Sequence, residues 1–288
     1  MIFTTTRLLD QIKLKGALAQ GRFEDQELLD IAYDSLMHDI VPFLIEKREE
    51  YYVVSTTSSI TASQSSYPMP RRAIGQTLRE VKLIRGTAVH DLKRMDVEEV
   101  RTTLSGTPEA FYVENNEVVL YPTPSSTQDT LKMYYYIRPS NLVPTSEGAI
   151  ITAIDTATNI LTITAGPSSW TTSNTFDLVQ GTSGFKIIGE DLTASSVSTT
   201  SITLTTLPST LVVGDYINLA DETCFPYLPT EAHGLLVFSA VAEILQSIGD
   251  MQGLQGAEAR VQKLKKGLTT LFATRISGAP KLITYSLL

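Results

Sequence analysis

Residues 107–143 read TPEAFYVENNEVVLYPTPSSTQDTLKMYYYIRPSNLV, and the strand pattern of this stretch decides the fold. Two apolar runs, residues 110–113 and 118–121, flank the turn sequence ENNE. Asparagine tolerates the positive φ angles of tight hairpin turns, so this spacing predicts a β-hairpin. After the loop PTPSS, residues 131–138 alternate and are rich in tyrosine, which predicts a further strand.

Upstream of this stretch, the sequence predicts helices and a polar loop. Apolar residues recur every three or four positions between residues 24 and 44 with acids between them, which is typical of an amphipathic helix. Pro42 has no backbone N–H to donate, so we expect a kink or a break there. Residues 4–19 predict a short helix. The run STTSSITASQSS at 55–66 predicts a polar loop between two strands, and residues 90–101 have helical spacing.

Downstream, residues 149–220 consist of short alternating runs rich in serine and threonine, with turn signals every eight to twelve residues. This pattern predicts a small all-β sandwich or barrel, with residues 155–159 at a hairpin tip. Trp170 is expected in a loop of this insert. An αα-hairpin is expected to follow the insert.

The first helix of this αα-hairpin is expected to begin with Thr230 as its N-cap and to end at Gly249. The second helix is expected to start at residue 256 or 257 and to end at residue 276, after a turn that contains Gly253.

The predicted fold class is α+β, with a helix-bundle core formed by the N-terminal helix and the C-terminal αα-hairpin, a β-strand region, and an inserted small all-β domain. Five segments are expected in order: 1–54, helical; 55–148, β-rich with a short helix; 149–222, the inserted sandwich or barrel; 223–276, the αα-hairpin, packing with residues 24–48; and 277–288, an extended C-terminal arm.

The composition of the 288 residues excludes several classes of protein. With 42% apolar and 19% charged residues, neither wholesale disorder nor a membrane protein fits. The N-terminus has no apolar segment of a signal peptide, so we expect synthesis in the cytoplasm. Cys224 is the only cysteine, which excludes an internal disulfide and any cysteine-based zinc site. Three histidines are few for metal chemistry, and we expect no cofactor.

The net charge of −8 is distributed unevenly along the chain. Residues 139–259 carry twelve acids and one base, so we expect this half to repel polyanions such as nucleic acid. Bases gather in residues 71–101, where eight bases meet five acids, and in residues 260–281, where six bases meet no acid. These two regions are the candidate docking surfaces for an acidic partner.

No catalytic constellation is evident. The glycines at 249, 253 and 256 lack the preceding strand and the Lys-Ser/Thr of a phosphate-binding loop, so they are interpreted as turn glycines. The adjacent pairs His38-Asp39 and His90-Asp91 point to different faces in a helix and form no relay unaided. Cys224 has no nearby base in the sequence to lower its pKa, so an inert thiol is expected. The protein is therefore not expected to be an enzyme.

The stretch 107–143 resembles a segment of tailed-bacteriophage head-to-tail adaptor, or connector, proteins. In that family an aromatic strand, a short turn, a strand ending in Tyr-Pro-Thr-Pro and a strand containing Tyr-Tyr and Arg-Pro follow one another. The resemblance extends upstream through the acidic helix and the motif Tyr-Pro-x-Pro-Arg-Arg at 67–72, and downstream to the αα-hairpin. The insert 149–220 is the part that varies among such proteins.

The resemblance implies a virion protein of the neck, in a homo-oligomeric ring of usually twelve subunits. Such a ring joins the portal to the tail, whose nozzle or tube protein is a partner, and passively lets double-stranded DNA through during genome ejection. With the charge pattern, this view singles out three sets of residues. They are the channel-lining acids Asp30, Asp34, Glu243 and Asp250; the docking bases Arg71, Arg72, Lys263, Lys265 and Lys266; and the portal-binding arm residues Lys281, Leu282, Ile283, Tyr285, Leu287 and Leu288.

Two other functions stay open. The serine- and threonine-rich insert and Trp170 suit a peripheral tail or neck protein whose β-domain anchors fibres or binds a host glycan. A glycan hydrolase that uses carboxylates such as Asp177 and Glu190 is the third reading, and it needs the two carboxyl groups to lie close together.

Overall fold

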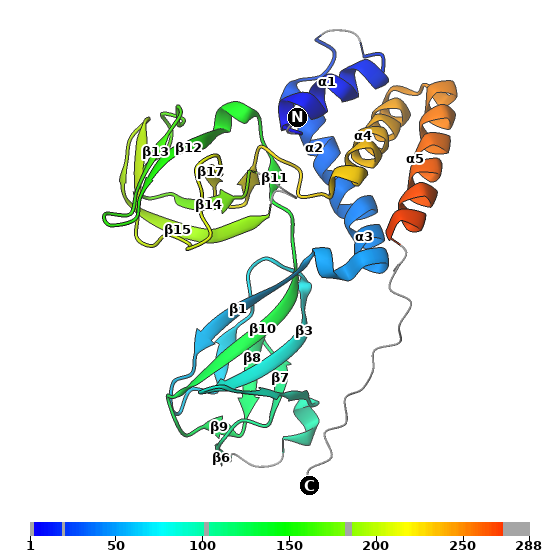
Figure 1. Ribbon diagram of the computed structural model, residues 1–288. Helices are drawn as coiled ribbons and strands as arrows, with labels where there is room; N and C mark the ends of the chain where they lie inside the picture. Colours follow the sequence, from blue (N-terminus) through cyan, green and yellow to red (C-terminus); the bar gives the residue numbers. More distant parts are fainter. Residues whose placement is uncertain (1–2, 19–20, 101–103, 182–185, 273–288) are drawn as a thin grey trace. The chain divides into compact units, whose positions relative to one another are not determined.

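The computed structural model describes residues 3–18, 21–100, 104–181 and 186–272 (Figure 1). The chain is a mixed α+β protein that divides into two compact units. The helix–barrel unit comprises Met1–Phe43 and Pro139–Leu288, and the sandwich unit comprises Leu44–Arg138. Each unit is described by itself below.

Two N-terminal helices begin with side-chain caps. Helix α1 (Thr5–Lys15) follows Thr4, whose hydroxyl accepts a hydrogen bond from the backbone N–H of Arg7. Helix α2 (Asp25–Ser35) opens with a reciprocal capping box between Glu24 and Glu27. Such caps satisfy backbone N–H groups that have no partner inside the helix. Both helices confirm the sequence-based prediction.

The predicted kink near Pro42 is present as a change of helix type. Helix α2 runs into a π-helical segment, η1 (Leu36–Ile40), and then into α3 (Val41–Arg48). The backbone N–H of Val41 donates to the carbonyl of Leu36, five residues back. The wider π turn precedes Pro42, which could not have donated to His38 in a regular α-helix.

Helix α4 (His233–Ile248) ends at Gly249, which has the positive φ of 76° typical of a helix C-terminus. Its predicted start is wrong, because Thr230 lies in a 3₁₀ turn, η5 (Thr230–Ala232). The predicted start of the next helix is also wrong. Helix α5 (Met251–Phe272) begins earlier, because the Asp250 carboxylate accepts the backbone N–H of Gly253 at 2.9 Å and caps it. Gly253 is therefore inside the helix.

Helix α4 is the central helix of its unit and contacts α1, α2 and α5. Its buried apolar residues point to several sides and are Leu235, Leu236, Val237, Ala240, Val241, Ile244 and Leu245. Helix α5 is longer but buries one face, made by Leu254, Ala257, Val261 and Leu268. One helix is thus surrounded by protein, whereas the other leaves most of its circumference in solvent.

The predicted β-insert is confirmed as a closed, six-stranded barrel with the strand order β12-β13-β16-β15-β14-β17. The strands are β12 (Gly148–Asp155), β13 (Ile160–Ile163), β14 (Thr175–Val179), β15 (Ile187–Val197), β16 (Ser201–Leu204) and β17 (Tyr216–Leu219). The barrel core includes Phe176, Leu178 and Ile217, all buried. Residues 155–159 form the expected hairpin tip between β12 and β13.

The chain enters and leaves the barrel at one place. Strand β11 (Asn141–Leu142) precedes the barrel, after which the 3₁₀ turn η4 (Thr145–Glu147) leads into it. Strand β18 (Glu222–Thr223) follows the barrel and pairs with β11 in parallel. The barrel is therefore an insertion whose two ends are tied together by a short ladder.

The sandwich unit consists of two four-stranded sheets with a shared apolar core. One sheet has the order β1-β10-β3-β4 and the other β2-β8-β7-β5. Their strands are β1 (Val53–Ser59), β2 (Ser66–Pro68), β3 (Ala73–Arg85), β4 (Ala88–Asp91), β5 (Lys93–Arg94), β7 (Ala110–Glu114), β8 (Glu117–Tyr121) and β10 (Asp129–Ile137). A short pair joins β6 (Ser105–Gly106) to β9 (Thr123–Pro124), and a 3₁₀ turn, η2 (Glu49–Tyr51), precedes β1.

Two further predictions concern this unit. The hairpin in the stretch 107–143 is confirmed as β7 and β8, with Asn115 and Asn116 at positive φ. The helix over 90–101 is wrong: its described residues form the end of β4, all of β5 and the 3₁₀ turn η3 (Val97–Glu99). His90 pairs with Leu83 of β3 in the sheet, and Val97 is exposed. The apolar spacing of this segment therefore does not mark a buried helix face.

Candidate assembly surfaces

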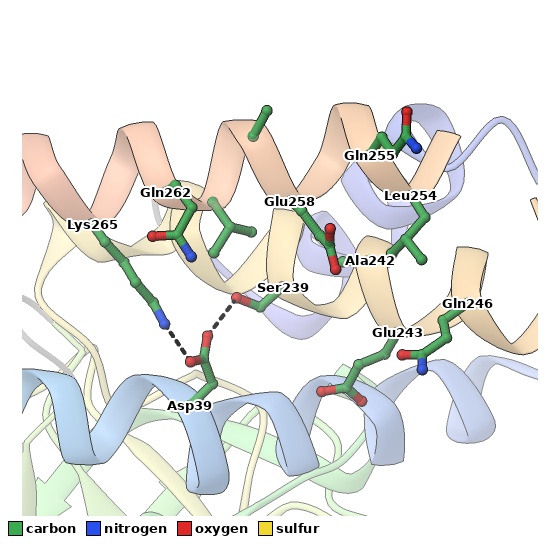
Figure 2. A pocket seen from close by; sticks show the side chains of 12 residues that line it. Asp39, Ser239, Ala242, Glu243, Gln246, Leu254, Gln255, Glu258, Gln262 and Lys265 are labelled. Carbon is green, nitrogen blue, oxygen red and sulfur yellow. Dashed lines mark hydrogen bonds and ion pairs between the residues drawn. The ribbon is translucent and has the colours of Figure 1, made fainter. Parts of the chain in front are cut away.

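A polar groove of about 630 Å³ lies among η1, α4 and α5 (Figure 2). The Asp39 carboxylate on η1 accepts a hydrogen bond from Ser239 Oγ on α4 at 3.2 Å and forms an ion pair with Lys265 on α5. Figure 2 shows these side chains converging from three elements. The two bonds join residues that are 200 and 226 positions apart in the chain, so they link η1 to α4 and to α5.

A second carboxylate in the groove is also bonded to a neighbouring helix. Glu243 on α4 accepts a hydrogen bond from Ser35 Oγ on α2 at 2.7 Å. Partial burial raises the pKa of Glu243, and the carboxylates of Asp34 and Asp39 raise it further, against the hydrogen bond from Ser35. A carboxylate in this position ties α4 to α2.

The four acids predicted to line a channel lie on α2, on α4 and at the start of α5. Asp30 and Asp34 are exposed on α2. Glu243 lies in the groove, and Asp250 caps the N-terminus of α5. Three of the four thus accept hydrogen bonds within the subunit, because Asp30 Oδ1 also accepts one from Gln26 Nε2 at 2.8 Å.

The five predicted docking bases divide between the two units. Arg71 and Arg72 precede β3 in the sandwich unit, where Arg71 is exposed and Arg72 is only 2% exposed. Lys263 and Lys266 are exposed on α5, whereas Lys265 is paired with Asp39 in the groove. Burial leaves Arg72 unable to present its charge to a partner at the surface. The predicted arm residues, 281–288, lie outside the described residues.

A model of a known family matches this chain. The family model described as "SU10 adaptor protein" matches residues 7–161, which is more than half of the chain. This chain belongs to the SU10 adaptor protein family. The family is one of phage head-to-tail adaptors, so the chain is a structural adaptor of phage particles, associated with portal and tail components. No curated protein matches it.

The family match locates the shared part of the adaptor. It covers α1 from Arg7, all of α2, η1 and α3, and the whole sandwich unit, and it ends at residue 161 in β13. Most of the barrel and the helices α4 and α5 lie beyond it. The resemblance seen in the sequence at 107–143 falls inside the matched range, because it rests on the strands of the sandwich.

The enzyme alternative loses one of its two carboxylates in the structure of the adaptor. Asp177 is fully buried and accepts the backbone N–H groups of Asp191 and Asp221, each at 3.0 Å. These bonds brace two turns of the barrel and leave no open face for a substrate. The SU10 adaptors are also a structural family and not an enzyme family. Within the described ranges, no three His, Cys, Asp or Glu side chains gather as a metal would require.

Two groups singled out in the sequence are buried in the adaptor. Trp170 lies in a loop, as predicted, but it is buried. Its ring packs edge-on against Phe176, with 5.3 Å between the ring centroids, so it is not available to stack on a sugar. Burial raises the pKa of Cys224 to about 11, which agrees with an inert thiol. None of the helices in the described ranges combines the length and apolarity that crossing a bilayer needs.

The ion pair between Asp39 and Lys265 is the feature that sequence reasoning missed. Lys265 was grouped with Lys263 and Lys266 as one basic patch. At 100° per residue, however, Lys265 lies beside the buried positions Val261 and Leu268, whereas the other two lie on the far side of α5. Helical phase could therefore have separated Lys265, although nothing in the sequence identified Asp39 as its partner.

Proposed function

We propose that this adaptor forms a ring of twelve subunits that joins the portal to the tail and surrounds part of the DNA channel in the virion neck. The observation that carries the proposal is the family match over residues 7–161, which includes one complete compact unit and the N-terminal helices. A helix bundle made by α2, α4 and α5 then stands around the channel. The partners are the portal and a nozzle or tail-tube protein.

The charge of the chain supports passive passage of DNA. The 288 residues carry a net charge of −8, and residues 139–259 hold twelve acids and one base. A negative conduit repels the phosphate backbone and does not trap the genome. The repulsion in this proposal comes from the regional excess of acids, because Glu243 and Asp250 are already engaged in bonds within the subunit.

The C-terminal arm, residues 277–288, is proposed to bind the portal. It is extended-biased by Pro280 and apolar, and such a segment can add to a groove or sheet of a partner. Deletion of residues 279–288 is expected to abolish attachment to the portal while the circular dichroism spectrum stays that of the full chain. A truncated chain that still binds portal rings contradicts the role of the arm.

Electron microscopy of the purified protein, alone and mixed with the portal protein of the same genome, tests the ring itself. We expect rings stacked on the portal in the mixture, with their symmetry visible in end-on views. A protein that stays a monomer or small oligomer beside unoccupied portals contradicts the proposed adaptor ring.

The second candidate is a peripheral role in which the barrel anchors tail fibres. Its support is a set of exposed apolar residues at one end of the barrel. Val212 and Val213 are exposed, and the next residue, Gly214, donates its backbone N–H to Ile151, beside the exposed Ile150. Apolar groups exposed together suit a protein partner better than a glycan. A pull-down with the fibre protein of the same genome, compared between the full chain and Val212→Ser/Val213→Ser, tests it.

A further inference from the structure

Two short rows of opposite charge lie on the helix–barrel unit. The acidic row is Asp30 and Asp34 on α2, and the basic row is Lys263 and Lys266 on α5; all four side chains are exposed. Residues three or four apart lie on one face of a helix. With a rise of 1.5 Å per residue, the acids are about 6 Å apart along α2 and the lysines about 4.5 Å apart along α5. The rows match in length and are opposite in charge.

Both rows are on helix faces turned away from the central helix. On α2, Leu28, Leu29 and Ala32 are buried, and α2 contacts α4. At 100° per residue, Asp30 and Asp34 lie on roughly the opposite side. Gln26 lies on the same face as Asp30, and its Nε2 donates to Asp30 Oδ1 at 2.8 Å and to the carbonyl of Leu142 in β11, so β11 borders the acidic row at its N-terminal end.

The same geometry holds for α5. Its buried positions contact α4, and Lys263 and Lys266 lie on the far side of the helix. Across the described residues, neither lysine is ion-paired, whereas Lys265 is held by Asp39. The basic row therefore points away from the acidic row of its own subunit and is available to another molecule.

We propose that the acidic row of one copy binds the basic row of the next copy, an inference that rests on the proposed ring. Two different surfaces of one chain then meet, which is the head-to-tail type of contact that closes into a ring. The charge complementarity commits the basic row to a second copy. DNA is a less suitable occupant, because residues 139–259 of the same unit carry twelve acids and one base and oppose a polyanion.

Reversal of charge tests this contact more sharply than removal of charge. Exposed ion pairs add little affinity, because water and salt screen them, whereas like charges placed opposite each other repel and prevent the right alignment. The acid-reversed variant is Asp30→Lys/Asp34→Lys, and the base-reversed variant is Lys263→Glu/Lys266→Glu. Each has two like-charged rows and is expected to form no ring on the portal.

An equal mixture of the two variants is expected to restore rings. The acid-reversed copy has two basic rows and the base-reversed copy has two acidic rows, so they fit in alternation around a ring of even number. Control variants with the same change of net charge are Glu98→Lys/Glu99→Lys on the sandwich unit and Lys15→Glu/Arg22→Glu on the helix–barrel unit, where these side chains are exposed. The controls are expected to form rings like the unaltered chain.

The outcomes separate this inference from the proposed function. Rings formed by each reversed variant alone overturn the contact while the adaptor ring stands. If the acid-reversed variant forms rings and only this variant retains DNA differently, the acids belong to the channel. This result also overturns the proposed contact between the rows. Loss of DNA binding in the base-reversed variant, with intact rings, assigns the lysines to DNA instead.

A second measurement covers the case in which the unaltered chain forms no ring or a variant does not fold. A mixture of ¹⁴N- and ¹⁵N-labelled unaltered protein is treated with a carbodiimide, which joins a carboxylate to a lysine amine without a spacer. Mixed-isotope peptides that link residue 30 or 34 to residue 263 or 266 support the contact. Absence of these peptides, with other cross-links present, overturns it, whether or not the portal is bound.

Discussion

The sandwich unit and the barrel are both built from antiparallel strands, yet they hold their buried carboxylates differently. In the sandwich, Asp129 is 3% exposed and accepts two hydrogen bonds from the Arg85 guanidinium, at 2.9 and 2.6 Å. In the barrel, Asp215 is fully buried and accepts the backbone N–H groups of Gly181 and Val212, both at 2.9 Å. A charged partner stabilises one carboxylate and loop backbone stabilises the other.

This difference matters for what each region can tolerate. A carboxylate that binds backbone N–H groups fixes the shape of its loop, so the barrel's loops are set by its own acids. The carboxylate of Asp129 is stabilised by the Arg85 side chain of the neighbouring strand β3, and this stabilisation is lost when the carboxylate is protonated at low pH. The family match includes the whole sandwich and ends early in the barrel, at residue 161.

The largest expected effect comes from the barrel core. Phe176→Ala removes a fully buried ring that Trp170 contacts edge-on, and such truncations cost about 4 kcal/mol of unfolding free energy. Trp170 is the only tryptophan, so its fluorescence reports on the barrel alone. During unfolding in urea, the fluorescence transition of the Phe176→Ala variant should therefore occur at a lower urea concentration than that of the unaltered chain. An unchanged fluorescence midpoint contradicts the packing described for the barrel.

The matched substitution in the sandwich separates the two regions. Leu131→Ala removes a fully buried leucine of strand β10 and should cost about 3 kcal/mol. The far-UV circular dichroism transition is expected to broaden or split, while the fluorescence transition of Trp170 stays where it was. If both signals shift together, the barrel and the sandwich unfold as one cooperative unit, and the expectation that they unfold independently is wrong.

The barrel and the hairpin of β7 and β8 could be predicted because their signals are local. Strict alternation marks a strand with one buried face, and Asn115 and Asn116 mark a tight turn. The segment 90–101 misled because its apolar spacing is also helical. Its structure is decided by the pairing of β4 with β3 and of β5 with β7, which local spacing does not encode. The start of α5 was missed because Gly253 and Gly256 were interpreted as turn residues, although Asp250 is a local N-cap signal.

The candidate surfaces were less accessible to sequence reasoning than the fold. The distribution of charges in the sequence drew attention to α2 and α5, where exposed acids and lysines lie. It did not separate Lys265, whose partner Asp39 is 226 positions away, from its exposed neighbours. Sequence composition records how many charges a segment has, whereas bonding between distant elements decides which charges remain available to a partner.

The next prediction concerns the carboxylate of the sandwich. Arg85→Gln leaves Asp129 buried without its charged partner and should lower the free energy of unfolding at neutral pH. The hydrogen bonds from Arg85 hold the pKa of Asp129 below its ordinary value of 3.8. The pair therefore stabilises the fold at pH values above the unfolded pKa, and this stability is lost as the pH falls through the folded pKa.

Urea unfolding at a series of pH values checks this sign. The gap in stability between the unaltered chain and Arg85→Gln should be widest at neutral pH and should close as the pH falls below about 3.8. Arg79→Gln is the control, because Arg79 pairs with Glu49 near the surface of the same unit. A gap that stays constant down to low pH would show that Arg85 acts through packing and not through the charge of Asp129.

The smallest expected effect lies at the hairpin tip of the barrel. Asp155 accepts hydrogen bonds from Thr158 Oγ1 at 2.6 Å and from the backbone N–H of Ala157 at 2.9 Å, and these bonds lower the pKa of its exposed carboxyl. Asp155→Ala should lower the melting temperature of the Trp170 signal by about 1 °C at neutral pH, because solvent competes for both bonds. Since the folded pKa is lowered, the difference should vanish in acid, as the pH falls through it. A shift that is equal at pH 3 and pH 7 would assign the effect to turn propensity and not to the carboxylate. That result would make the barrel's exposed acid unlike the carboxylate that Arg85 holds in the sandwich.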